Sequence, residues 1–228
     1  MHLPGVWMTV IKGAIAVLTR YPRPGRCKTR LIPLMGKRGA SMLHKALAEH
    51  TISRLKTYVI GHPADLIIFY SGAYEAEARK WLGEDIVYAA QPPGDLGAKI
   101  AYAFEMTFQI GYGRTLVLGT DCPDMDLKIL DDAFSALESK DMVLGPAEDG
   151  GYYLVGLKHA CSKELFEGIP WGSAQVLETT VERAKSLKLH LEMLPLFPDL
   201  DRPDDLLKVK DAGIKAVIET ICCATEEL

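Results

Sequence analysis

One short segment of the sequence gathers positive charge beside residues that stiffen or turn the backbone. Segment 20–31 follows an apolar run and carries two prolines, one glycine and five cations: Arg20, Pro22, Arg23, Pro24, Gly25, Arg26, Lys28 and Arg30. Proline fixes the backbone, and glycine permits turns that other residues resist. At the end of a strand, such a loop predicts phosphate binding by Arg20, Pro24, Gly25, Lys28 and Arg30. The alternative interpretation is a solvated basic loop.

Aspartates in two later segments have the type and position of metal ligands. Asp121 follows the apolar run 115–119 and is held by Pro123, which suits a hard-oxygen ligand for Mg²⁺ or Mn²⁺. A helix cap is the alternative, although Asp124 or Asp126 would fit that role better. Near the end of the chain, a second metal ligand is expected from one of two further aspartates, Asp199 and Asp201. An Asp-x-Pro turn that starts a helix explains them equally well.

The acidic-glycine segment 148–151 is the candidate acceptor site. Its residues are Glu148, Asp149, Gly150 and Gly151. The two carboxylates could bind an acceptor, bind a metal or, at Asp149, act as a general base. A tight acidic turn between two strands is the alternative. Trp171 could stack on a base, a sugar or an acceptor, although a tryptophan is more often simply packed.

Composition limits the class of protein. A chain of 228 residues fits one α/β domain, residues 1–228. The net charge of −4 gives no basic field for nucleic acid, and the apolar runs are too short to span a membrane. The five cysteines are odd in number and contain no Cys-x-x-Cys pair, and we see no signal peptide. We therefore expect a cytoplasmic protein with reduced thiols and no nucleic-acid or membrane partner.

Apolar runs alternate with helix-period segments along most of the chain. The expected strands are 14–19, 66–70, 86–90, 115–119, 142–145, 152–157 and 189–194, and the expected helices are 39–58, 74–82, 98–110, 128–137, 175–187 and 203–223. Continuous apolar strands indicate a mostly parallel sheet covered on both faces. Only a short turn precedes 152–157, so an antiparallel part must begin after residue 150. The polar clusters follow strand ends and should meet at one sheet edge.

Six motifs, in order over nearly the whole chain, carry a family resemblance: residues 22–31, 94–97, 119–123, 145–154, 169–173 and 199–206. The chain resembles the bacterial nucleotide-diphospho-sugar transferase-like (glycosyltransferase) family. That family includes the arsenosugar biosynthesis glycosyltransferase and is similar in fold to molybdenum cofactor guanylyltransferase and phospholactate guanylyltransferase. Arg20 stands where the family usually has lysine, and Ala98-Lys99 stands where a Glu-Arg pair is usual.

The resemblance implies a three-layer α/β/α sandwich of the nucleotide-diphospho-sugar transferase (GT-A-like) type. It implies that loop 20–30 binds phosphates and that Asp121 binds a divalent metal, with Asp199 or Asp201 as the second ligand. It also places four residues near the base or ribose: Gly94, Asp95, Leu96 and Gly97.

Three functions remain open at this point. The first is a metal-dependent glycosyltransferase in which the metal and the loop, with Lys28, neutralise a departing nucleoside diphosphate, while Asp149 activates a small-molecule acceptor. The second is a nucleotidyltransferase that joins a nucleoside triphosphate to a phosphorylated acceptor and releases pyrophosphate. The third is a nucleotide-binding protein without turnover.

Overall fold

A computed structural model describes residues 12–159 and 163–226. The expectations about a signal peptide and about Cys161 fall outside those ranges. The strands form one seven-stranded sheet in the order β3-β2-β1-β4-β6-β5-β7. Their bounds are β1 (Gly13–Arg20), β2 (Ala64–Ser71), β3 (Val87–Ala90), β4 (Arg114–Leu118), β5 (Met142–Pro146), β6 (Tyr152–Lys158) and β7 (Leu191–Met193).

Helices connect these strands. They are α1 (Ile32–Ile60), α2 (Glu75–Leu82), α3 (Leu96–Ile110), α4 (Lys128–Ser139), α5 (Val176–Ser186) and α6 (Ala212–Glu226), with short 3₁₀ turns η1 (Thr29–Leu31), η2 (Lys163–Leu165) and η3 (Pro203–Leu207). Within the described residues, no helix is both long and apolar enough to cross a bilayer.

Strand directions follow from the lengths of the connections. β1 pairs in parallel with β2 and β4, β2 with β3, and β5 with β7. β6 runs antiparallel to both β4 and β5, because turn 147–151 is too short for a crossover. The antiparallel part expected after residue 150 is therefore confirmed.

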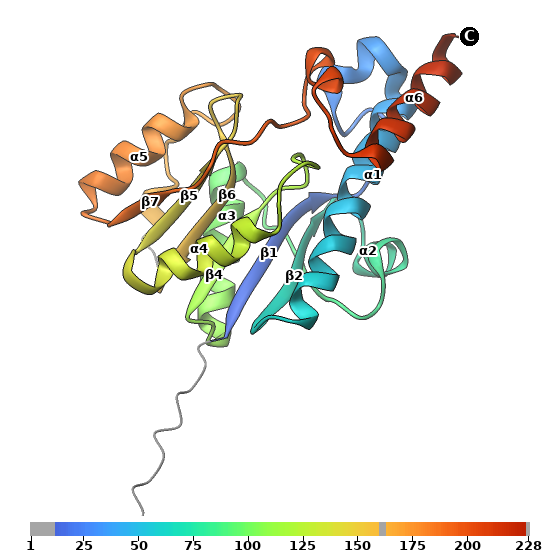
Figure 1. Cartoon of the computed structure of the whole chain (residues 1–228). Coiled ribbons are helices and arrows are strands. Elements are labelled where there is room, and N and C mark those ends of the chain that lie inside the picture. Colours follow the sequence, from blue (N-terminus) through green and yellow to red (C-terminus); the bar gives the residue numbers. More distant parts are fainter. Residues whose placement is uncertain (1–11, 160–162, 227–228) are drawn as a thin grey trace, which may run out of the picture.

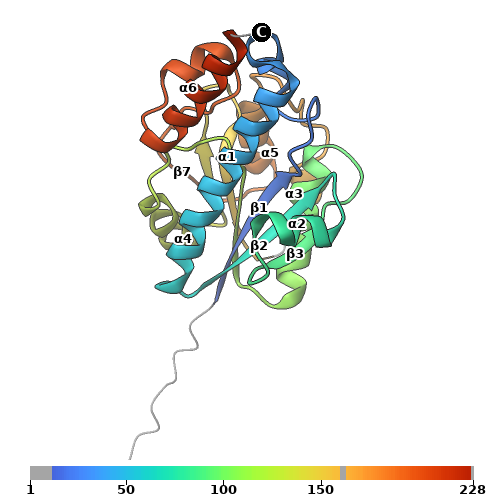
Figure 2. The ribbon, with the colours of Figure 1, turned by 90° about the vertical axis from the view of Figure 1, so that its right-hand side faces the viewer.

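The sheet is covered on both faces, as its continuous apolar strands predict (Figures 1 and 2). Along β1, Ile15 and Val17 face a core with α1, α2 and α4, whereas Ala14 and Ala16 face a second core with α3 and α5. Alternate residues of a strand point to opposite faces, which explains this division. The three-layer α/β/α sandwich is confirmed.

A third apolar cluster lies away from the sheet, between α1 and α6, which run side by side (Figure 2). It joins Leu31, at the end of loop 20–31, to Leu200 and Val209 of the segment 194–211, which we call the strap. A methyl group on Gly39 of α1 would lie 2.6 Å from Cγ2 of Ile221, so this close packing requires glycine. The cluster therefore anchors both the cationic loop and the strap to the pair of helices α1 and α6.

The predicted last helix, 203–223, is wrong in its first part. The chain forms η3, leaves helical geometry and starts α6 only at Ala212. The Asp124 carboxylate accepts hydrogen bonds from the backbone N–H groups of Lys210 and Asp211, at 2.8 and 2.7 Å. Asp211 then caps α6 by accepting from Ile214 N at 2.9 Å. The predicted helix 39–58 begins earlier than expected, at Ile32, and is interrupted at Gly36.

Candidate functional site

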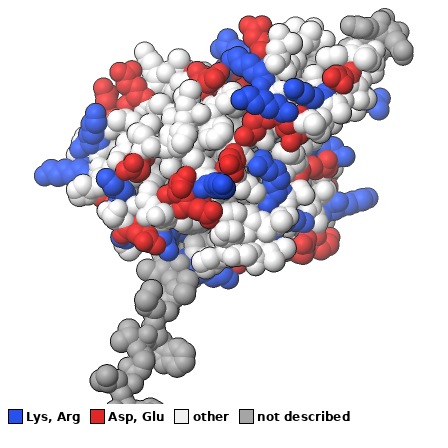
Figure 3. Space-filling view, in the orientation of Figure 1, with Lys and Arg blue, Asp and Glu red and all other residues white. Residues whose placement is uncertain are grey.

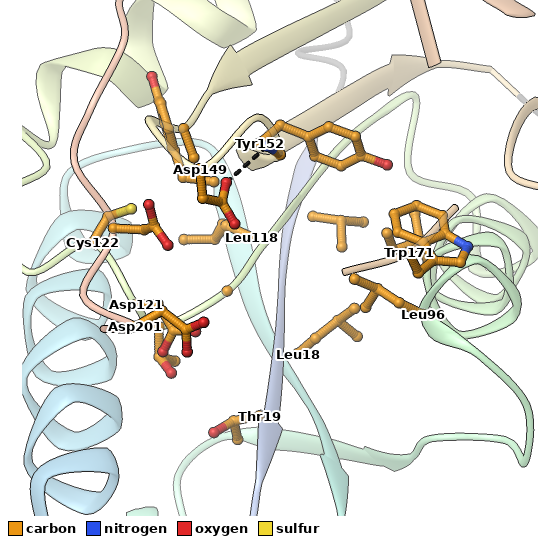
Figure 4. A pocket seen from close by; sticks show the side chains of 18 of the residues that line it. Leu18, Thr19, Leu96, Leu118, Asp121, Cys122, Asp149, Tyr152, Trp171 and Asp201 are labelled. Carbon is orange, nitrogen blue, oxygen red and sulfur yellow. Dashed lines mark hydrogen bonds between the residues drawn. The ribbon is translucent and has the colours of Figure 1, made fainter. Parts of the chain in front are cut away.

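A cavity of about 440 Å³ opens at the carboxyl ends of β1 and β4. Four carboxylates line it, from the loop after β4, from turn 147–151 and from the strap: Asp121, Asp149, Asp199 and Asp201. Figure 4 shows acidic side chains on one side of this cavity and Leu18, Leu96, Tyr152 and Trp171 on the other. The polar clusters thus meet at one sheet edge, as the strand order predicts.

Lys28 lies at the back of the acidic side. Its backbone is left-handed, with φ 44° and ψ 47°, and its side chain is only 3% exposed. The Nζ atom lies 2.9 Å from Oδ1 of Asp121 and 3.7 Å from Oδ1 of Asp201, and it donates to the carbonyl oxygen of Leu200. Lys28 therefore contacts the two candidate metal ligands directly.

The other loop cations are divided between the cavity and its surroundings. Arg20 and Arg30 line the cavity, and Arg30 also pairs with Asp201. The Arg20 guanidinium donates to the carbonyl oxygen of Arg26 at 3.1 Å, which closes the loop on itself. Gly25 takes a φ of +78°, a turn that favours glycine. Neither Pro24 nor Gly25 reaches the cavity wall. In Figure 3, Lys and Arg side chains gather at the upper edge beside acidic ones.

Asp149 and Asp199 form a second acidic pair. Burial, with the nearby Asp149 charge as the next cause, raises the pKa of Asp199 to about 6. Oδ1 of Asp149 accepts a hydrogen bond from Gly151 N at 2.7 Å, so this side chain is held by its own turn. The carboxylates of the cavity thus separate into Asp121 with Asp201, beside Lys28, and Asp149 with Asp199.

Turn 147–151 contributes only part of the acceptor residues predicted from the sequence. Asp149 and Gly151 line the cavity. Glu148 points instead to Lys208 of the strap, with an ion pair of 2.8 Å. Gly150, at φ +88°, approaches the backbone of Ala174 so closely that a methyl group would lie 2.3 Å from its oxygen. These two residues fix the turn in place.

Trp171 lies on the apolar side of the cavity, edge-on to Tyr152 with ring centroids 6.1 Å apart. A methyl group on Gly97 would lie 2.8 Å from its Nε1 and 2.3 Å from the oxygen of Phe166. Gly97 therefore provides the space for the indole. Trp171 is placed where an apolar part of a ligand could pack on it.

The predicted base or ribose motif 94–97 contributes one residue to this cavity, Leu96. Asp95 caps α3 by accepting from Ala98 N at 2.9 Å, and it lines a separate cleft with Gly94 and Gly97. Lys99 also lines the main cavity.

Several lining residues were not assigned from the sequence. Gln91 joins the ends of β1 and β2, because its Nε2 donates to the carbonyl oxygens of Thr19 at 3.0 Å and Phe69 at 2.7 Å. The buried hydroxyl of Thr19 has no partner among the described residues, so it is available to a ligand. In the sequence, only its position directly after the third strand indicated that Gln91 could line the site.

Burial shifts the pKa values of two other groups in the cavity. Burial lowers the pKa of His44, whose Nε2 contacts the carbonyl oxygen of Arg20 at 2.8 Å. Burial and then the charges of Asp121 and Asp199 raise the pKa of the Cys122 thiol. A thiol held protonated is a poor nucleophile.

The residues around Asp121 fit a metal that is shared with a substrate. Asp121 and Asp201 offer two carboxylates, and the side chain of Asp121 is 48% exposed. Among the described residues, no group of three or more His, Cys, Asp or Glu side chains is arranged to hold an ion alone. Mg²⁺ commonly uses one or two carboxylates together with substrate phosphates, and Mn²⁺ accepts similar ligands. This donor set suits a metal–polyphosphate complex.

Comparisons with known proteins agree with the resemblance seen in the sequence. A family model described as "Uncharacterized protein conserved in bacteria (DUF2064)" matches residues 54–173. A crystal structure from Desulfovibrio desulfuricans G20, described as a "putative nucleotide-diphospho-sugar transferase", is 30% identical with a TM-score of 0.82, covering 92% of this chain and 97% of that one. No curated protein matches the chain significantly.

More distant structures share the fold, and they include a nucleotidyltransferase and a sugar transferase. The inositol-1-phosphate CTP transferase from T. maritima is 13% identical with a TM-score of 0.53, covering 92% of this chain and 96% of that one. Glucosyl-3-phosphoglycerate synthase from Mycobacterium tuberculosis, in complex with Mn²⁺, UDP and phosphoglyceric acid, is 11% identical with a TM-score of 0.52, covering 93% of this chain and 79% of that one. The nucleotide-diphospho-sugar transferase fold is therefore confirmed.

Proposed function

The chain belongs to the DUF2064 family of proteins conserved in bacteria, and from that premise we propose that it is a metal-dependent glycosyltransferase with a nucleotide-diphosphate sugar as donor. One observation carries the proposal. A single cavity joins Arg20 of the cationic loop to four aspartates. A site that binds a diphosphate and a metal ion together needs that combination of charges.

In the proposed arrangement, the diphosphate of the donor lies between Arg20 and Asp121. The chain would hold Mg²⁺ or Mn²⁺ through Asp121 and Asp201, with Asp199 as the alternative second ligand. When bound, the metal supplies positive charge that stabilises the departing diphosphate. Arg20, which also lines the cavity, adds the positive charge of its guanidinium.

The acceptor would enter on the side of turn 147–151. Oδ1 of Asp149 accepts a hydrogen bond from Gly151 N at 2.7 Å, so the side chain is already held in place before an acceptor binds. We assign it the role of orienting an acceptor hydroxyl and taking its proton. Trp171 and Leu96 would contact the apolar part of the acceptor or sugar.

Nucleotidyl transfer is the second candidate, and one feature of the site favours it. Gly119 stands two residues before Asp121, so Asp121 itself lacks the Asp-x-Asp pair common in sugar transferases of this fold. Asp121 with Asp201 would then hold the metal of a nucleoside triphosphate, and pyrophosphate would leave. Binding without turnover is the third possibility.

Product analysis separates these reactions. The full chain is incubated with Mn²⁺ and, in turn, nucleotide sugars and nucleoside triphosphates, together with a mixture of small acceptors. Release of nucleoside diphosphate indicates glycosyl transfer, release of pyrophosphate indicates nucleotidyl transfer, and the absence of both indicates a binding protein.

Asp121→Asn tests the metal role in the same assay. We expect at least about a hundredfold loss of metal-dependent turnover, because one carboxylate of the donor set becomes neutral. Asp132→Asn, an exposed aspartate on α4 outside the cavity, is the matched control and should keep full activity. An active Asp121→Asn enzyme would refute the mechanism.

A further inference from the structure

We propose that the Lys28 ammonium occupies the place of the divalent cation in the nucleotide-free protein, so that metal and nucleotide favour each other's binding. The inference deepens the proposed function, on which it rests. It concerns a group of loop 20–31 that lies against Asp121 and Asp201 but does not itself line the cavity.

The contacts of Lys28 are those of an internal cation. Its Nζ lies 2.9 Å from Oδ1 of Asp121 and 3.7 Å from Oδ1 of Asp201, and it also donates to the oxygen of Leu200. Its side chain is 3% exposed and does not form part of the cavity wall. An ammonium with two carboxylates and a carbonyl as neighbours has the surroundings of a bound hard cation.

The backbone of Lys28 supports a specific placement. It adopts the left-handed conformation, which is unfavourable for a residue with a side chain and persists only when its surroundings impose it. Leu31, three residues later, lies in the same apolar cluster as Leu200. The loop and the strap therefore hold the ammonium against the carboxylates from both sides.

A divalent ion and this ammonium compete for the same oxygens. Close approach of two cations in a partly buried site is strongly unfavourable. The metal alone would have to displace Lys28 without offering it another anion. A polyphosphate removes this repulsion, because its oxygens can accept hydrogen bonds from the Lys28 ammonium and can also ligate the metal.

Metal and nucleotide should then enhance each other's binding. By linkage, the factor by which the nucleotide increases metal affinity equals the factor by which the metal increases nucleotide affinity. In the absence of nucleotide, the positive charge of Lys28 balances the negative charge of Asp121.

Mn²⁺ titration of the nucleotide-free full chain tests the competition, with free Mn²⁺ followed by electron paramagnetic resonance. Lys28→Met should bind Mn²⁺ at least about tenfold more tightly than the wild type, because a charge at contact distance is removed. Arg26→Met is the matched control. It removes one cation from the same loop, from an exposed side chain, and should change the affinity by less than about threefold.

The outcomes separate this inference from the proposed function. If Lys28→Met and Arg26→Met have the same Mn²⁺ affinity as the wild type, the competition is wrong and the metal-dependent transferase stands. If no variant binds Mn²⁺, even with nucleoside diphosphates added, both proposals fall.

A measurement on the wild type covers the case in which Lys28→Met does not fold. Lysine acylation is followed residue by residue by mass spectrometry. Lys28 should be protected without metal and should react several-fold faster at saturating Mn²⁺, whereas the exposed Lys37 should not change. Continued protection of Lys28 with Mn²⁺ bound would overturn the proposal.

Discussion

Two of the aspartates in the cavity have a positive charge beside them, and a third has a negative one. Lys28 lies beside Asp121 and Asp201, whereas the neighbour that most affects Asp199, after burial, is another carboxylate, Asp149. These two factors raise the pKa of Asp199 to about 6. Its ionisation therefore opposes folding, and the stability that the protonated form contributes is lost as the pH rises through 6.

Asp199→Asn should remove this pH-dependent loss. Below the unfolded pKa, near 3.8, Asp199 is protonated in both the folded and the unfolded state, so none of this stability is lost there. Between pH 4 and pH 7 the variant should gain about 1 kcal/mol of unfolding free energy relative to the wild type, a value reduced because Asp199 is only partly buried. Urea unfolding at both pH values measures the gain. Asp204→Asn, exposed on η3, is the control, and an equal gain there would contradict the assignment.

The strap is the element on which the acidic side of the cavity depends. Leu200 is 1% exposed, its N–H donates to the carbonyl oxygen of Asp121 at 2.9 Å, and its own oxygen accepts from Lys28. The ion pair between Lys208 and Glu148 joins the same segment to turn 147–151. One segment thus holds both Asp121 and turn 147–151 in place.

Leu200→Ala should loosen this arrangement. Loss of a fully buried leucine costs about 2–5 kcal/mol of stability, and turnover should fall further than in other variants of equal stability because Lys28 and Asp121 lose a common support. The control is Leu207→Ala, in the same segment but 90% exposed, which should change stability by less than about 0.5 kcal/mol. Equal effects of the two substitutions would show that the strap does not anchor through Leu200.

Elements with strong local patterns were predictable from the sequence, and those set by distant contacts were not. All seven expected strands are present, because continuous apolar runs such as 66–70 are typical of buried parallel strands. The last helix was predicted too long because Asp124 holds residues 210 and 211 out of helical geometry. Asp211 did carry a local signal, as a capping residue before α6.

For the molecule as a whole, strand order brings distant segments to one cavity. That Asp121, Asp149 and the strap would meet follows from the parallel sheet. The direction of each side chain does not follow, because it depends on partners far along the chain. Lys28 lies against Asp121 rather than in the cavity wall, and Glu148 pairs with Lys208.

Ligand binding should stabilise the whole chain by mass action. A nucleotide with Mn²⁺ at about one hundred times its dissociation constant adds about 2.7 kcal/mol, which corresponds to a rise in Tm of about 5–10 °C for a chain of this size. Thermal unfolding with nucleotide and Mn²⁺, separately and together, measures the rise. The combined shift should exceed the sum of the separate shifts in the wild type. Additive shifts would contradict coupled binding.

The hydrogen bond from Lys28 to the oxygen of Leu200 spans 172 positions of the chain. During synthesis, Lys28 leaves the ribosome long before Leu200 does. Asp121 is likewise made before the strap, whose Leu200 N–H donates to its carbonyl oxygen. A truncated product ending before residue 199 would keep all seven strands of the sheet yet lack Asp199, Asp201 and the Leu200 carbonyl that accepts from Lys28. Translation must therefore pass the strap before the chain contains all four aspartates that line the cavity.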